Sequence, residues 1–206
     1  MKVYLFGKIM HINTNYLILD HAGIGELIYV PNISRFKKDE LRKIFICNIS
    51  NEYTNTTYGF DNFKELVLFE DLIALSGIGP KIALSILNNG WENVLSWIAN
   101  SEVKNLSKLQ FVSNKIANNI VFTYSEKYKK FLNKLSEDDE TKFKEKIETS
   151  KNKSQFEETM KMLGFKYNQI KYALENITLS DNIEQCVENA IKVISLKQQN
   201  EPRVQG

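Results

Sequence analysis

The stretch best suited to bind a ligand is LSGIGPKIALSIL, residues 75–87. Two glycines flank one isoleucine, and glycine accepts positive φ angles without steric cost, so the pair predicts a sharp turn. Pro80 follows at the start of a run of helix formers, where its missing N–H costs nothing in the first helical turn. A helix that begins directly after a tight turn leaves its first backbone N–H groups free. We therefore expect binding of an anion such as phosphate here; a purely structural turn between two helices is the alternative.

Positive charge is concentrated around this turn. The whole chain carries a net charge of +2. Residues 72–134 hold 8 Lys and Arg against 3 Asp and Glu, while residues 1–71 hold 8 against 9 and residues 135–206 hold 11 against 13. A basic segment beside an anion-binding turn favours a polyanion over a small metabolite as the partner. A solvated basic face without a partner is the alternative.

The residue types that catalysis or metal binding would need are sparse. The chain has two cysteines and two histidines, far apart and without metal-ligand spacing, and no phosphate-binding P-loop. Its densest acidic cluster, 137–140, lies in a segment without strand character. We therefore expect no catalytic residue, no metal and no cofactor. No apolar run reaches membrane-spanning length and the N-terminus does not resemble a signal peptide, so we expect a cytoplasmic protein without a membrane partner.

Two kinds of element must position the turn. Residues 1–62 contain several short alternating strands, which predict a small closed barrel of the OB type; another small β-barrel is the alternative. Residues 63–135 change to helical periodicity and form the predicted nucleic-acid-binding domain.

The last third of the chain predicts a separate module. Residues 136–153 are rich in mixed charge and poor in apolar side chains, so we expect a flexible or weakly helical linker. Residues 154–197 contain three short amphipathic helices, and residues 198–206 look like a disordered tail. A bundle with so small a core is expected to dock a partner rather than to catalyse a reaction.

This order of parts resembles the RuvA family of bacterial proteins, which bind Holliday junctions during branch migration. The resemblance covers nearly the whole chain, and three stretches carry it: TYGF at 57–60, LFEDLIALSGIGPKIALSIL at 68–87 and MLGFKYNQI at 162–170. It implies an α+β multidomain fold, with an OB-type barrel, a helical domain with two helix-hairpin-helix elements and a C-terminal three-helix UBA-like bundle.

The resemblance also implies a function. A member of this family is expected to bind four-way DNA junctions and, with the hexameric motor ATPase RuvB, to promote branch migration in recombination and repair. The motor would consume the ATP, so the chain itself would be a non-catalytic DNA-binding subunit. The barrel would build a homotetramer or an octamer, and a RuvC-type resolvase or its replacement would act with the complex. An OB-fold protein that binds single-stranded nucleic acid or RNA is the alternative.

The expected DNA contacts follow residue by residue from the two hairpins. In the first hairpin they are Gly77, Ile78, Gly79 and Lys81, whose glycines would let the backbone approach phosphates without reading bases. The second hairpin aligns with LQFVSNKIANN at 109–119, where Phe111 and Ser113 stand in place of the glycines. Its expected contacts are Lys108, Ser113 and Lys115.

Two further sites follow from the resemblance. The family has a loop of paired acidic residues at the tetramer centre, and here Glu52 matches the first position of this acidic pin while Tyr53 occupies the second. In the C-terminal bundle, Leu163, Phe165 and Ile170 are candidates for core or for the motor-binding surface, and we expect Leu163 to belong to the core.

Overall fold

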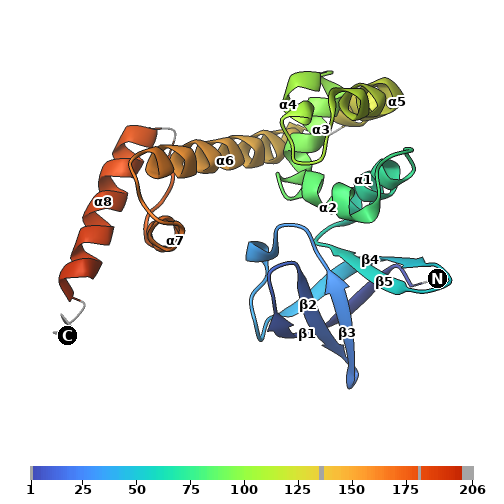
Figure 1. Ribbon diagram of the computed structural model, residues 1–206, viewed down its shortest axis with the longest axis horizontal. Coiled ribbons are helices and arrows are strands. Elements are labelled where there is room, and N and C mark those ends of the chain that lie inside the picture. The colour runs from blue at the N-terminus through green and yellow to red at the C-terminus, as the bar shows by residue number, and fades with distance from the viewer. Residues whose placement is uncertain (1, 135–136, 181, 201–206) are drawn as a thin grey trace. The chain divides into compact units, whose positions relative to one another are not determined.

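The computed structural model describes residues 2–134, 137–180 and 182–200 (Figure 1). The chain divides into two compact units, Met1–Leu135 and Ser136–Gly206. The first contains the strands and five helices, and the second contains three helices.

A five-stranded closed barrel forms the N-terminal part of the first unit (Figure 1). Its strands are β1 (Tyr4–Ile12), β2 (Tyr16–His21), β3 (Ile24–Tyr29), β4 (Leu41–Ser50) and β5 (Asn55–Phe60). The order around the barrel is β1-β2-β3-β5-β4, and all neighbours are antiparallel except β3 and β5. The predicted small barrel is confirmed, and its form fits an OB fold.

The alternation of the sequence explains how the barrel closes around a core. Every second side chain from Leu5 to Ile9 is buried on β1, and the intervening ones are exposed. The resulting core contains Leu5, Ile9, Leu17, Leu19, Ile28, Val30, Phe36, Ile44 and Ile46. A single turn of 3-10 helix, η1 (Ile33–Arg35), leads from β3 towards β4.

Five helices follow the barrel within the same unit. They are α1 (Phe63–Ile73), α2 (Pro80–Leu87), α3 (Trp91–Ala99), α4 (Val103–Ser107) and α5 (Asn114–Leu132). Helix α1 packs against α2, and α5 packs against α3 and α4. Each helix buries apolar side chains, of which α4 contributes Leu106 alone, and α1–α2 and α4–α5 form two helical pairs with connecting turns.

The second unit contains α6 (Glu137–Met162), α7 (Tyr167–Asn176) and α8 (Ile183–Asn200). Its core consists of Phe156, Met160, Ile170, Ala173, Cys186, Val187, Ala190 and Ile194. The predicted linker at 136–153 was expected to be flexible or weakly helical, and its residues 137–153 belong to α6. This segment lacks Gly and Pro, and pairs such as Glu148 with Lys151 place opposite charges three residues apart, which favours a helix.

Part of the predicted tail at 198–206 is helical. Helix α8 includes residues 198–200, and residues 201–206 lie outside the described part of the chain. None of the described helices combines the length and the apolar character that crossing a membrane requires.

Candidate nucleic-acid interface

The first hairpin, residues 74–79, joins α1 to α2. Its backbone turns at Gly77, whose φ of 89° lies in the left-handed region that glycine adopts readily. The N–H of Ile78 closes the turn on the carbonyl of Leu75 at 3.1 Å, and the Ile78 side chain is buried. Ile78 therefore anchors the turn from inside while the two glycines lie at the surface.

The second hairpin, residues 108–113, joins α4 to α5 and repeats this geometry. Phe111 takes the place of Gly77 and has a φ of 67°. The N–H of Val112 bonds the carbonyl of Leu109 at 3.1 Å, and the Val112 side chain is buried as that of Ile78 is. The second hairpin therefore follows a similar backbone course without a glycine at either position.

The first hairpin presents free backbone donors at the start of α2. Gly79 is the N-cap and carries no side chain that could cap the helix. The N–H groups of Gly79, Lys81 and Ile82 donate no hydrogen bond to any described residue. A Cβ added to Gly79 would have no atom of the protein within 4 Å. This helix start is thus open to a ligand and rich in donors.

The second hairpin differs in its cap. The hydroxyl of Ser113 accepts the N–H of Ile116 at 3.3 Å, so the protein itself satisfies one of the donors. The N–H groups of Ser113, Asn114 and Lys115 bond no other described residue. The second hairpin therefore keeps three free amides as well, and Ser113 acts in the structure as a helix cap.

Three lysines beside the hairpins carry a positive charge that no described carboxylate neutralises. Lys81, Lys108 and Lys115 are exposed, and no described carboxylate lies within ion-pair distance of them. By contrast, Lys127 on the same helix as Lys115 pairs with Asp71 at 2.5 Å. The cations nearest the hairpins are therefore available to an external anion.

The carboxylate of Asp71 also fixes the two hairpins relative to each other. The hydroxyl of Tyr128 donates to its Oδ2 at 2.5 Å, and the hydroxyl of Tyr124 donates to the Asp71 carbonyl at 2.7 Å. Burial, followed by the hydrogen bond to Asp71, raises the pKa of Tyr128 far above its ordinary value, so its hydroxyl stays a donor. Because Asp71 lies on α1 and both tyrosines lie on α5, this cluster ties the helix before the first hairpin to the helix after the second.

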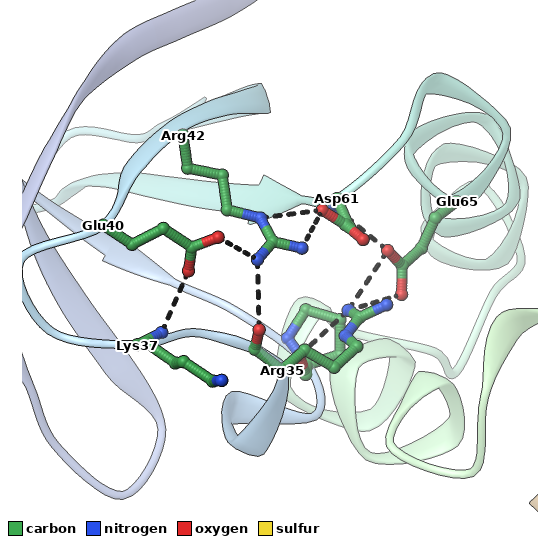
Figure 2. A network of polar contacts seen from close by, with 7 residues as sticks. Arg35, Lys37, Glu40, Arg42, Asp61 and Glu65 are labelled. Atoms are coloured by element: carbon green, nitrogen blue, oxygen red, sulfur yellow. Dashed lines mark hydrogen bonds and ion pairs between the residues drawn. The ribbon is translucent and has the colours of Figure 1, made fainter.

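A second polar network joins the barrel to α1 (Figure 2). Nη2 of Arg35 donates to both carboxylate oxygens of Glu65, at 3.0 and 3.2 Å. Arg42 on β4 donates to Asp61 at 2.7 Å, and the backbone N–H of Asp61 donates to Glu65 at 3.2 Å. Residues of η1, β4 and the first turn of α1 thus form one connected network.

Glu65 is the buried member of this network. Its side chain is 1% exposed, whereas that of Arg35 is 23% exposed. Burial raises the pKa of Glu65 above its ordinary value, and the adjacent Arg35 guanidinium opposes this shift. The residues that position the hairpins on the barrel, Arg35 and Glu65, were not identified from the sequence, because they are thirty residues apart.

The predicted acidic pin lies on the turn between β4 and β5. The side chain of Asn51 holds this turn by accepting the N–H groups of Tyr53 at 3.0 Å and of Thr54 at 2.8 Å. Glu52 and Tyr53 project from it, and the Tyr53 side chain is 90% exposed. An acidic and an aromatic side chain are therefore presented together at the tip of the hairpin.

The three candidates in the C-terminal bundle differ in exposure. Ile170 is 2% exposed and belongs to the core, and Phe165 is partly buried against the same core. The expectation that Leu163 is a core residue is wrong, because its side chain is 55% exposed. Leu163 follows the end of α6, where the chain leaves the helix. Met162 and Tyr167, which the sequence reasoning missed, are 76% and 73% exposed beside it in sequence.

Two family descriptions match the parts just described. Residues 1–59, the barrel, match the RuvA N terminal domain, and residues 69–124, the two hairpins and their helices, match the SAM-like Helix-hairpin-helix tandem. Fold and site thus define a class of protein in which a barrel of this type carries a tandem of helix-hairpin-helix elements.

Relatives extend the similarity to the whole chain. A protein of Metamycoplasma arthritidis is 62% identical over 204 residues, which cover 99% of this chain and 100% of the relative. Relatives from Mesomycoplasma hyopneumoniae and Mycoplasmopsis agalactiae are 45% and 37% identical, and each alignment covers 95% of this chain and at least 96% of the relative. All three are named Holliday junction branch migration complex subunit RuvA. The chain belongs to the RuvA family.

Proposed function

We propose that this chain binds four-way DNA junctions and acts as the DNA-binding subunit of a branch migration complex in recombination and repair. The names of its full-length relatives support this function. The observation that carries it is the pair of matching hairpins, each with three free backbone N–H groups, in the segment with the largest positive excess. Amides and lysines of this kind bind phosphates and leave base edges unread.

Each expected DNA contact has a role in this proposal. The free amides of Gly79 and Lys81 bind phosphate oxygens at the first hairpin, and Ile78 holds the turn in shape from beneath. Lys81, Lys108 and Lys115 add charge. Ser113 takes part as the cap that orients the start of α5, which points the amides of Asn114 and Lys115 outward.

The bundle formed by α6, α7 and α8 serves, in this proposal, as a UBA-like docking module for the motor ATPase RuvB. The exposed apolar side chains of Met162, Leu163 and Tyr167 would form the contact surface, while Ile170 supports it from the core. ATP would be consumed by the motor, and this chain would be non-catalytic and need no cofactor.

Assembly of the barrel completes the proposal. Tyr4, Phe6 and Leu41 are large apolar side chains on neighbouring strands β1 and β4, and each is more than half exposed. Such a surface supports association of four barrels, or eight in two facing rings. A four-fold arrangement would bring the Glu52 turns to the centre of the junction. A RuvC-type resolvase or its replacement would act on the same complex in the cytoplasm.

A branch migration assay tests the motor-dependent part of this proposal. We expect the chain to stimulate ATP-dependent strand separation of a labelled four-way junction by its motor partner. Leu163→Asp should abolish the stimulation without weakening junction binding, because the side chain is exposed. The matched variant Ile170→Ala should instead lower the stability of the bundle. Full stimulation by Leu163→Asp would rule out this docking surface.

A further inference from the structure

Phe111 lies in a conformation that its side chain does not favour. Its φ of 67° is a left-handed value that bulky residues rarely adopt, whereas Gly77 reaches the equivalent position of the first hairpin at no steric cost. The Phe111 side chain is 65% exposed, so burial of the ring does not compensate for this conformation. The inward anchor of the second hairpin is its neighbour Val112, which is buried.

The surroundings of the ring select its partner. Lys108 lies three residues before Phe111 and Lys115 four residues after it, and both are exposed without an ion pair among the described residues. The sequence has no acidic residue between Glu102 and Glu126. An exposed aromatic ring between two lysines without ion pairs is complementary to a polyanion that has apolar surface between its charges. DNA has this pattern, since deoxyribose and base edges lie between its phosphates.

We propose that Phe111 is a non-ionic DNA contact, whose ring packs against deoxyribose and base edges between the phosphates that Lys108 and Lys115 contact. Proteins that bind the minor groove insert apolar side chains such as Phe between base steps, so an apolar ring is a known kind of DNA contact. The proposal rests on the proposed junction binding of the same hairpin. It assigns the second hairpin a contact that glycine cannot make.

Two substitutions separate a DNA contact from a structural role. Phe111→Gly removes the ring and also relieves the unfavourable φ, so this variant should be at least as resistant to urea as the unchanged chain. Phe111→Ala removes the ring and keeps the Cβ. Phe122→Ala is the matched control, because Phe122 is an exposed aromatic residue of α5 outside the hairpins, with 90% of its side chain accessible.

Affinity for a fluorescent four-way junction is measured for each full-length variant over a series of salt concentrations. Both Phe111 variants should bind at least about fivefold more weakly, the lower end of the effect of an aromatic contact with a base. The slope of log affinity against log salt should stay unchanged, since no phosphate contact is lost. Lys115→Ala should reduce that slope by about 0.9. Phe122→Ala should bind as the unchanged chain does.

Unaltered affinity of Phe111→Gly would overturn the proposal while leaving junction binding intact. A reduced salt slope in the Phe111 variants would also overturn it, because the loss would then be ionic. If the unchanged chain fails to bind the junction, the proposed function itself fails, and this outcome is distinct from the other two.

Discussion

Arg35 and Glu65 connect the barrel to the helices through one guanidinium nitrogen that lies 3.0 and 3.2 Å from the two carboxylate oxygens. Arg35 ends the 3-10 turn after β3, and Glu65 lies in the first turn of α1, where its own N–H bonds the capping side chain of Asn62 at 2.8 Å. The carboxylate therefore adds a polar contact between two parts of the unit, beside the packing of Phe69 on α1 against Tyr58 and Phe60 on β5. Both hairpins follow α1 in the chain, so this contact helps to place them on the barrel.

Replacing Glu65 by Ala should lower the free energy of unfolding of the first unit by about 3 kcal/mol. This is the lower end of the cost of removing one partner from a buried ion pair, and Arg35 retains some access to water. Glu65→Gln should cost clearly less, because its amide oxygen can still accept from Arg35. Urea unfolding measures both variants. As a control, Lys8→Met removes the exposed pair with Asp39 and should change little. Equal stability of Glu65→Ala and the unchanged chain would contradict the role of this contact.

The pH dependence of stability should also reveal Glu65. Burial raises the folded-state pKa of Glu65 above its ordinary value of 4.5, so the folded chain binds this proton more tightly than the unfolded chain. The resulting stabilisation is complete below the unfolded pKa and is lost as the pH rises through the folded pKa. The unchanged chain should therefore lose stability relative to Glu65→Gln as the pH rises from about 4.5 through the folded-state pKa. If the unchanged chain instead gains stability relative to Glu65→Gln as the pH rises, the attraction of Arg35 for the carboxylate exceeds the cost of its burial.

Gly79→Ala should weaken junction binding without disturbing the fold. The φ of Gly79 is −86° and a Cβ meets no atom of the protein, so Ala is tolerated by the chain itself. The added methyl group would instead meet the phosphate that the free amides bind, and Gly79→Val should have a larger effect. Both should weaken binding more than Lys115→Ala does, as measured by fluorescence anisotropy. Gly25→Ala on the barrel is the control, since its Cβ would make only an ordinary contact of 3.5 Å. Unchanged affinity of Gly79→Val would exclude the first hairpin as a phosphate site.

The turn that carries Glu52 and Tyr53 should set the preference for junctions over duplex. Carboxylates at the centre of a four-fold assembly would repel phosphates, and this repulsion is only partly screened over about 10 Å at ordinary salt. Tyr53→Asp should therefore raise the ratio of junction to duplex affinity, and Glu52→Gln should lower it. The ratio is obtained from competition at fixed salt. If neither variant changes it, the turn does not act as an electrostatic pin in this chain.

The first hairpin and the barrel could be predicted because local signals specify them. Gly77 and Pro80 mark a turn and a helix start within a few residues, and the alternation along β1 fixes which side chains face inward. The second hairpin lacks this signal. Its left-handed residue is Phe111, which sequence reasoning assigns to such a conformation only through comparison with the first hairpin.

Features that depend on distant residues could not be predicted. Nothing near Arg35 in the sequence points to Glu65, and nothing near Asp71 points to Tyr128 on α5. The exposure of Leu163 depends on where α6 ends and on which side chains of α6 pack against α7 and α8. For the predicted linker at 136–153 the sequence left a flexible segment and a weak helix open, because mixed charge is typical of both, and residues 137–153 belong to α6.

The most direct test of the central claim is competition for binding among three DNAs at the same salt concentration. A labelled four-way junction is bound by the full-length chain, and unlabelled junction, linear duplex and single strand of matched length compete for it. We predict that the junction competes best, that duplex competes more weakly and that single strand competes least, with affinity falling steeply as salt rises. Stronger competition by single strand than by junction would contradict the account and favour a single-strand-binding OB-fold protein instead.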